Sequence, residues 1–307
     1  MVTDAAAGAT TSALTVGFLG LGIMGTAMCR NLLKCGAFNK VVVWNRTASK
    51  CDELVAEGAV AASSPAEVVQ QADITFGMLA DPKAALKAAL SAGGVVEGIS
   101  AGKAYVDMST VDEATSQHIA AAVTAKGARF LEAPVSGSKK PAIDGQLIIL
   151  AAGDEGLFAE CEAAFSAMGK RSLFLGAVGA GARMKLVVNM VMGSMMGAFC
   201  EGTALADKAG LSQPDLLEVL GLGAMANPMF GLKGPALMQR QYPPAFPLKH
   251  QQKDMRLALA LGDSLNQALP VAAAANEAYK QAKSKGYGDA DFAAVYEATQ
   301  ASGVTLN

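Results

Sequence analysis

The sequence has few histidines and cysteines. Both residues are common metal ligands, and cysteines form disulfide frameworks. The 307 residues include two histidines, His118 and His250, and five cysteines, no two of which form a C-x-x-C pair. A structural zinc site or a disulfide framework needs these residues at characteristic spacings. We therefore expect neither a bound metal nor a disulfide framework.

Charge of one sign and long apolar runs are also lacking. Lys and Arg number 25 against 27 Asp and Glu, and the net charge of −2 provides no electrostatic surface for nucleic acid or an acidic membrane. The most apolar stretch, residues 186–200, contains Asn189 and is shorter than the ~20 residues that cross a bilayer. We expect small molecules and further copies of the chain as partners, with no nucleic acid and no membrane.

Residues 1–13 contain no Lys or Arg and are rich in Ala, Thr and Ser. They match neither a secretory signal nor a basic transit peptide. We interpret them as a disordered extension and expect a cytoplasmic protein. An organellar form, left after removal of a transit peptide, is the alternative.

A glycine turn directly behind an apolar run is the most informative motif. Residues 16–19 predict a strand, Gly20, Gly22 and Gly25 follow, and an amphipathic helix then ends near Gly36. In a Rossmann unit the first glycine permits the turn, the second admits a pyrophosphate, and the third lets helix and strand pack closely. A chance match among 33 glycines is the alternative, but the flanking strand and helix favour dinucleotide binding.

The next strand, residues 41–44, indicates which dinucleotide binds. Its end lies ~20 residues beyond the glycines, where NAD enzymes usually carry an Asp or Glu that binds the ribose 2′-hydroxyl. This chain has Asn45, Arg46 and Thr47 instead. The Arg46 guanidinium can bind a 2′-phosphate through charge-assisted hydrogen bonds of about 1.5–3 kcal/mol each, which predicts NADPH over NADH by about one to two decades. A solvated surface arginine is the alternative.

Apolar strands and helical segments alternate from about residue 15 to residue 176, as is typical of a mostly parallel sheet covered on both faces. Further strands are expected near residues 59–62, 73–79, 105–109, 129–135, 147–153 and 172–176. Residues 182–209 then predict one long helix, and only helices follow. The expected fold class is α/β: a Rossmann-type NADP-binding domain over residues 14–178 and an all-helical substrate and dimerisation domain over residues 179–307, joined by a long interdomain helix.

Lys185 and Asn189 are candidates for chemistry. They lie four residues apart and share one face of the long helix, with Gly181 one turn earlier leaving room for a ligand. Lys185 stands among apolar residues, and its ammonium group could donate a proton to a carbonyl oxygen as hydride arrives at carbon. A lysine that only extends to solvent from an amphipathic helix is equally compatible with this spacing.

Two other segments could contribute to the same site. Ser136 and Gly137 follow an expected strand, where open α/β sheets bind ligands, and could hold a carboxylate. Residues 242–247 are aromatic and proline-rich, lead into the polar residues 249–254, and could close a pocket. An ordinary loop and a helix cap are the alternatives.

Separated motifs run along most of the chain: the glycine turn, Asp107-Met108-Ser109-Thr110, Pro134-Val135-Ser136-Gly137, residues 181–189 and Lys253-Asp254. Together they resemble the β-hydroxyacid dehydrogenase family. Residues 44–47, 136–142 and 243–254 further resemble its plant-type NADPH-dependent glyoxylate/succinic semialdehyde reductases. The chain departs from many relatives at Ser138-Lys139-Lys140, which bears on substrate identity rather than on reaction type.

The resemblance implies that Lys185 is the catalytic residue. The residues implied to orient the substrate, or to close and brace its site, are Ser136, Gly137, Asn189, Phe246 and Asp254. The expected cofactor-binding residues are Gly20, Gly22, Ile23, Met24, Gly25, Asn45, Arg46, Thr47, Met78, Leu79, Thr110 and Lys253.

The implied reaction is NADPH-dependent reduction of small aldehyde acids, glyoxylate to glycolate or succinic semialdehyde to 4-hydroxybutyrate, with Lys185 as general acid. A 3-hydroxyisobutyrate-type dehydrogenase working with NAD is one alternative, and Arg46 disfavours it. A dinucleotide-binding scaffold without turnover is another, and Lys185 disfavours it. The apolar helical domain favours a homodimer or homotetramer, and the aldehyde chain length stays open.

Overall fold

The computed structural model describes residues 12–299 and divides the chain into two compact units, residues 1–185 and 186–307. Of the predicted extension, residues 1–11 lie outside the described residues, whereas Ser12 and the residue after it already belong to the first strand. The division falls inside one continuous helix, α10 (Ala180–Lys208). The domain boundary expected between residues 178 and 179 stays a prediction.

The first unit contains one sheet, in which the strands β3-β2-β1-β4-β5-β6 are parallel neighbours. Beyond β6 the sheet continues through the antiparallel neighbours β8 and β7, and β9 pairs with β8 in parallel. The expectation of a mostly parallel sheet is confirmed. The strands are β1 (Ser12–Leu19), β2 (Phe38–Trp44), β3 (Val60–Ala61), β4 (Ile74–Gly77), β5 (Ala104–Asp107), β6 (Arg129–Glu132), β7 (Val135–Ser136), β8 (Leu147–Gly153) and β9 (Gly169–Phe174).

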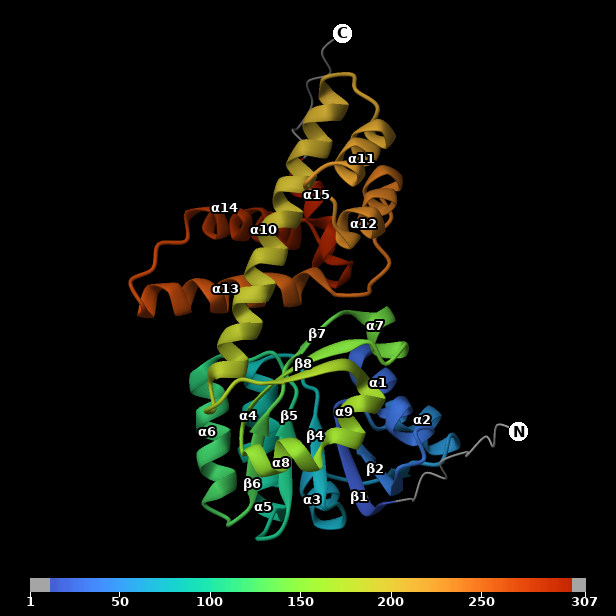
Figure 1. Cartoon of the computed structure of the whole chain (residues 1–307), viewed down its shortest axis with the longest axis vertical. Helices are drawn as coiled ribbons and strands as arrows, with labels where there is room; N and C mark the ends of the chain where they lie inside the picture. The colour runs from blue at the N-terminus through green and yellow to red at the C-terminus, as the bar shows by residue number, and fades with distance from the viewer. Residues whose placement is uncertain (1–11, 300–307) are drawn as a thin grey trace, which may run out of the picture. The chain divides into compact units, whose positions relative to one another are not determined.

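Helices cover both faces of this sheet (Figure 1). Phe18 and Leu19 point to opposite faces because successive strand residues alternate. Phe18 belongs to the core that contains Met28 of α1, and Leu19 belongs to the core that contains Val68 of α3. The helices of this unit are α1 (Ile23–Lys34), η1 (Ala48–Cys51), α2 (Asp52–Ala56), α3 (Pro65–Gln71), α4 (Pro82–Leu90), α5 (Val95–Gly98), α6 (Glu113–Thr124), α7 (Lys139–Ile143), α8 (Glu155–Glu160) and α9 (Glu162–Met168).

The strand expected over residues 129–135 is in fact two strands. β6 pairs with β5 in parallel, whereas β7 pairs with β8 in antiparallel orientation. Pro134 lies between them and has no N–H to continue a ladder, so the chain changes direction there. This break places Ser136 on a separate short strand instead of at the end of β6.

The second unit is helical. Among residues 186–299, no strand forms, and an isolated bridge joins Pro247 to Asp291. Its core includes Met196, Tyr279 and Phe292, which are nearly or fully buried, so the methionine-rich helix α10 contributes to this core. Besides α10, its helices are α11 (Gln213–Leu222), α12 (Pro228–Gln239), α13 (Leu248–Ser264), α14 (Pro270–Ser284), η2 (Tyr287–Asp289), η3 (Phe292–Val295) and α15 (Tyr296–Thr299).

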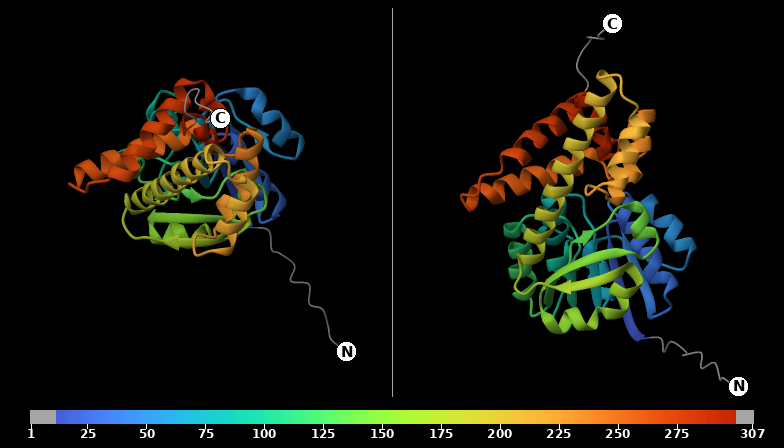
Figure 2. Two further views of the ribbon diagram at one scale, coloured as in Figure 1. Left: turned by 90° about the horizontal axis from the view of Figure 1, so that it is seen from above. Right: turned by 45° about the horizontal axis from the view of Figure 1, so that its top comes forward.

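Within this unit, α13 and α14 run side by side (Figure 2). The segment before α13 is held by Asp291, which is 2% exposed and accepts a hydrogen bond from the backbone N–H of Phe246 at 3.1 Å. The Lys233 Nζ lies 2.7 Å from the Asp291 carboxylate, so this buried charge is paired. No helix within residues 12–299 combines the length and apolarity needed to span a bilayer.

Candidate active site

The carboxyl ends of five parallel strands form one row in the first unit. The register pairs Leu19 with Trp44 on one side and with Gly77 on the other, Gly77 with Asp107, and Asp107 with Glu132. The chain runs outward from β1 to β2 and β3, then returns to the other side of β1 at β4. Ligands of open α/β sheets bind at such a switch point.

The glycine turn lies at this switch point and has the predicted geometry. Gly20 has a φ of +94°, and a Cβ there would lie 2.4 Å from the Met78 carbonyl oxygen. A Cβ on Gly25 would lie 1.9 Å from the Gly20 oxygen, so helix α1 can approach the strand only with glycine at this position. A Cβ on Gly22 would meet no atom within 4 Å, which leaves open space beside the start of α1.

The turn after β2 braces the glycine turn. The Asn45 Oδ1 accepts a hydrogen bond from the Leu21 N–H at 2.9 Å, and the Asn45 Nδ2 donates to the Thr47 carbonyl at 2.9 Å. The Asn45 side chain is therefore used to shape the turn. Arg46 is exposed and forms no ion pair with a carboxylate among residues 12–299, so its guanidinium can bind an anionic ligand.

Met78, Leu79 and Thr110 follow the next two strands. The Leu79 N–H donates to the Ser109 Oγ at 2.9 Å, and the Ser109 N–H donates to the buried Asp107 Oδ1 at 3.0 Å. Asp107 and Ser109 thus connect the turns after β4 and β5. Their individual roles were not predicted. The sequence does contain a signal for Asp107, because an acidic residue at the end of an apolar strand indicates a polar role at that edge of the sheet.

The Ser136 turn is built by β7 and the glycine after it. Gly137 has a φ of +128°, and a Cβ there would lie 2.8 Å from the Leu147 side chain. Ser136 is partly exposed at the strand end. Lys140 lies 2.7 Å from Asp144 in an exposed ion pair.

Helix α10 carries Lys185 and Asn189 on its buried face. Their exposures are 5% and 2%, whereas Met184 and Val187 are 43% and 46% exposed. A lysine that only reaches solvent would show the opposite pattern. The structure therefore disfavours the solvent-directed interpretation of Lys185 that spacing alone left open.

The reason expected for Gly181 was wrong. A Cβ on Gly181 would lie 2.4 Å from the Leu150 carbonyl oxygen and 3.1 Å from the Glu132 Oε1. The space beside Gly181 is thus filled by the protein itself. Glycine is required because the backbone of α10 passes close to β8, and it does not leave room for a ligand.

In the second unit, Asp254 holds two of the predicted residues. The Asn189 Nδ2 donates to the Asp254 Oδ2 at 2.6 Å, and the Lys253 Nζ lies 3.1 Å from the Asp254 Oδ1. The Gln251 Nε2 adds a hydrogen bond to the Asn189 carbonyl at 2.9 Å. Phe246 packs against Phe292 with ring centroids 5.7 Å apart. Asp254 thus has the geometry of a bracing residue, while the enclosing role of Phe246 stays a prediction.

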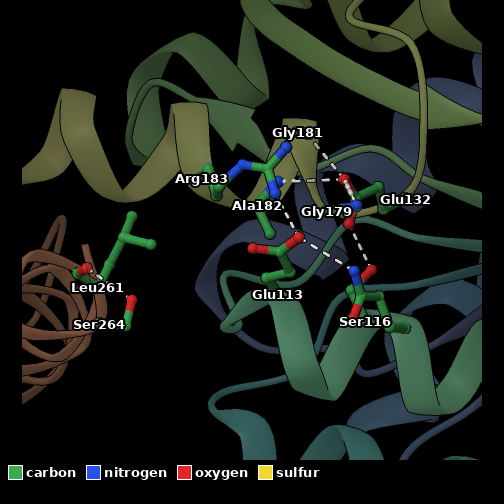
Figure 3. A network of polar contacts seen from close by, with 10 residues as sticks. Glu113, Ser116, Glu132, Gly179, Gly181, Ala182, Arg183, Leu261 and Ser264 are labelled. Atoms are coloured by element: carbon green, nitrogen blue, oxygen red, sulfur yellow. Dashed lines mark hydrogen bonds and ion pairs between the residues drawn. The ribbon is translucent and has the colours of Figure 1, made fainter.

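Glu132 was missed as a functional candidate. This carboxylate is 2% exposed, and its Oε1 accepts hydrogen bonds from the N–H groups of Gly179 and Gly181, each at 2.7 Å, and of Ala182 at 3.2 Å (Figure 3). The Ser116 hydroxyl donates to its other oxygen. Burial raises the pKa of the Glu132 carboxyl, and these hydrogen bonds oppose that rise.

The parallel sheet, the glycine turn at its switch point and the lysine on α10 define a dinucleotide-dependent oxidoreductase. Residues 15–179 match the model of the NAD binding domain of 6-phosphogluconate dehydrogenase, and residues 179–299 match that of the NAD-binding domain of NADP-dependent 3-hydroxyisobutyrate dehydrogenase. The chain belongs to the β-hydroxyacid dehydrogenase family.

Two curated relatives and one solved structure illustrate the similarity. The chain is 64% identical to glyoxylate/succinic semialdehyde reductase 1 of Arabidopsis thaliana, over 94% of this chain and 99% of that protein. It is 56% identical to the chloroplastic reductase 2 of the same plant, over 94% of this chain and 80% of that protein. A crystal structure of 3-hydroxyisobutyrate dehydrogenase from Salmonella typhimurium has a TM-score of 0.84 at 28% identity, covering 92% of this chain and 99% of that one.

Proposed function

We propose that this chain is an NADPH-dependent reductase of small aldehyde acids, which converts glyoxylate to glycolate and succinic semialdehyde to 4-hydroxybutyrate. The observation that carries the proposal is the 5% exposure of Lys185 on the same face of α10 as Asn189. The names of the two plant relatives, at 64% and 56% identity, support the substrate class.

The residues at the strand ends fit NADPH. The first turn of α1 has no side-chain cap, so its backbone N–H groups can bind a pyrophosphate, and the open space beside Gly22 admits it. Arg46 is the cation for the 2′-phosphate, and no acidic residue among Asn45, Arg46 and Thr47 repels that group. When bound, NADPH supplies the hydride for the carbonyl carbon.

The chain's own residues bind the substrate and move the proton. Ser136 and the backbone around Gly137 orient the substrate carboxylate. The Lys185 ammonium stabilises the negative charge that develops on the carbonyl oxygen and donates a proton to that oxygen, which completes the alcohol. Asn189 is fixed by its hydrogen bond to Asp254 and orients the substrate from the next turn of α10.

We further propose a homodimer or homotetramer in the cytoplasm. Large exposed apolar side chains on the second unit, such as Leu222 at 82% and Leu232 at 66%, support association between copies. An oxidative 3-hydroxyisobutyrate-type activity is the second candidate, supported by the solved neighbour of that name and disfavoured by Arg46.

Lys185→Ala tests the proposal. Because general acid catalysis supplies roughly 10²–10⁴ in rate, kcat for glyoxylate and succinic semialdehyde should fall by about that factor. NADPH consumption is followed by absorbance, and NADPH affinity, measured by fluorescence titration, should stay unchanged. Lys126→Ala removes an exposed lysine beyond the end of α6 and is the matched control. A Lys185→Ala protein with nearly full kcat would refute this mechanism.

A further inference from the structure

The start of α10 is capped by a residue that is remote in sequence. The first N–H groups of a helix have no partner within the helix. Gly179 precedes α10 and has no side chain with which to cap it. Glu132, at the end of β6, serves instead and accepts three of these N–H groups at 2.7–3.2 Å (Figure 3).

The capping carboxylate is buried and held by hydrogen bonds on both of its oxygens. Glu132 is 2% exposed and Ser116 of α6 is fully buried, and the hydrogen bond between them fixes the second carboxylate oxygen. A carboxylate is favoured at this position because the amino end of a helix carries partial positive charge. The backbone of Gly181 lies so close to Glu132 that a Cβ would approach its Oε1 to 3.1 Å, so a larger residue cannot replace this glycine without displacing the carboxylate.

The capped turn immediately precedes the turn that carries Lys185. Ala182, the last residue bound by Glu132, lies three residues before Lys185, which is less than one helical turn. In the other direction, Glu132 lies four residues before Ser136. One carboxylate therefore ties the start of the helix that presents the lysine to β6, the strand that leads to the predicted carboxylate-binding turn.

We infer that Glu132 is a positioning residue for the reduction: it sets the placement of Lys185 relative to the Ser136 turn by holding the first turn of α10. This inference rests on the proposed function. A misplacement of ~1 Å can lower a rate by ~10²-fold. We therefore expect kcat to depend on whether the side chain at position 132 is long enough to reach the N–H groups of α10, and less on whether it is charged.

Two substitutions separate reach from charge. Glu132→Asp keeps the charge but is one methylene shorter, so it cannot keep all three N–H bonds, and kcat should fall by about 10- to 100-fold. Glu132→Gln keeps the length and one acceptor oxygen and can donate its amide to the Ser116 hydroxyl, so kcat should stay within about threefold of the wild type. NADPH affinity should be unchanged in both because the hydrogen bonds of Glu132 go to Ser116 and the start of α10, and none goes to the expected pyrophosphate and 2′-phosphate sites at α1 and Arg46.

Glu113→Gln is the matched control. Glu113 also connects α6 to the start of α10, through its ion pair with Arg183, but this contact is partly exposed and involves a side chain of the helix. This variant should keep kcat within about twofold, since surface ion pairs contribute little. If Glu132→Asp does not fold, Ser116→Ala, which removes the hydroxyl on the second oxygen, should lower kcat by about three- to tenfold with unchanged NADPH affinity.

The outcomes distinguish a positioning role for Glu132, the failure of that role alone, and the failure of the proposed function. A large kcat loss in Glu132→Asp with rescue in Glu132→Gln and unchanged NADPH affinity supports positioning. Full kcat in Glu132→Asp or, where that variant does not fold, in Ser116→Ala overturns the inference, as does equal loss in the Asp and Gln variants or loss of NADPH binding together with kcat. Lys185→Ala is measured in parallel: if it keeps its kcat, the proposed function itself fails, whereas if it loses activity and Glu132→Asp does not, only the inference about Glu132 fails.

Discussion

Removing the guanidinium group of Arg46 should weaken binding of NADPH and leave binding of NADH unchanged. Arg46 follows β2 at the row of strand ends, where the ribose of the cofactor is expected. It is exposed and forms no ion pair with a carboxylate within residues 12–299, so Arg46→Ala breaks no internal ion pair. Its effect on the free energy of unfolding should be within about 0.5 kcal/mol.

The size of the effect follows from the bonds that are lost. One charge-assisted hydrogen bond contributes about 1.5–3 kcal/mol, which corresponds to about 10- to 150-fold in affinity. Because Arg46 is exposed, solvent and salt screen the interaction and place the expected loss near the lower end, at about tenfold. The loss should grow as the ionic strength is lowered.

The assay compares kcat/KM for NADPH with kcat/KM for NADH at two salt concentrations. Arg46→Glu, which adds repulsion of the 2′-phosphate and an acceptor for a 2′-hydroxyl, should shift the preference further toward NADH. Lys50→Ala is the matched control, because Lys50 is an exposed cation in the neighbouring η1. Unchanged selectivity in both Arg46 variants, or equal losses for the two cofactors, would refute the assignment of the 2′-phosphate to Arg46.

Two further predictions concern stability in acid and thiol reactivity. Hydrogen bonds from Arg240 and Tyr242 hold the pKa of Glu297 below its usual value, so its contribution to stability is present above a pH of about 4.5 and is lost as the pH falls through the lowered pKa. Urea midpoints of Glu297→Gln should therefore decline less steeply in acid than those of the wild type, and parallel declines would contradict this reasoning. Burial raises the pKa of Cys161 to about 12, whereas Cys35 is only partly buried, so iodoacetamide at neutral pH should label Cys35 first; equal labelling rates, measured by peptide mass spectrometry, would contradict it.

Local signals predicted the parts of the fold that depend on neighbouring residues. The strand, glycine turn and helix from Val16 to Lys34 could be predicted because their signals lie in one short segment: an apolar run, a glycine with a φ of +94° and, in the helix, Gly25, whose Cβ would meet the Gly20 oxygen. The long helix over residues 182–209 could be predicted for the same reason, because its apolar composition and the glycine that follows it lie in one segment.

Contacts between distant segments could not be predicted in this way. The break at Pro134 depends on the pairing of β7 with β8, and the cap of α10 joins Glu132 to residues 47–50 positions away. The hydrogen bond between Asn189 and Asp254 spans 65 positions. The resemblance to a family identified both of these residues, but only the structure connects one to the other.

The continuity of α10 across the two compact units limits how the protein can be dissected. A fragment that stopped at Lys185 would retain only residues 180–185, fewer than two turns of a 29-residue helix, which is too short to persist unaided. A fragment that started at Leu186 would have a new helix N-terminus, whose first backbone N–H groups would lack the carboxylate cap that Glu132 provides in the whole chain. Expression of the halves as separate polypeptides should therefore keep the whole helix with the second half and extend that fragment to Gly179 or earlier.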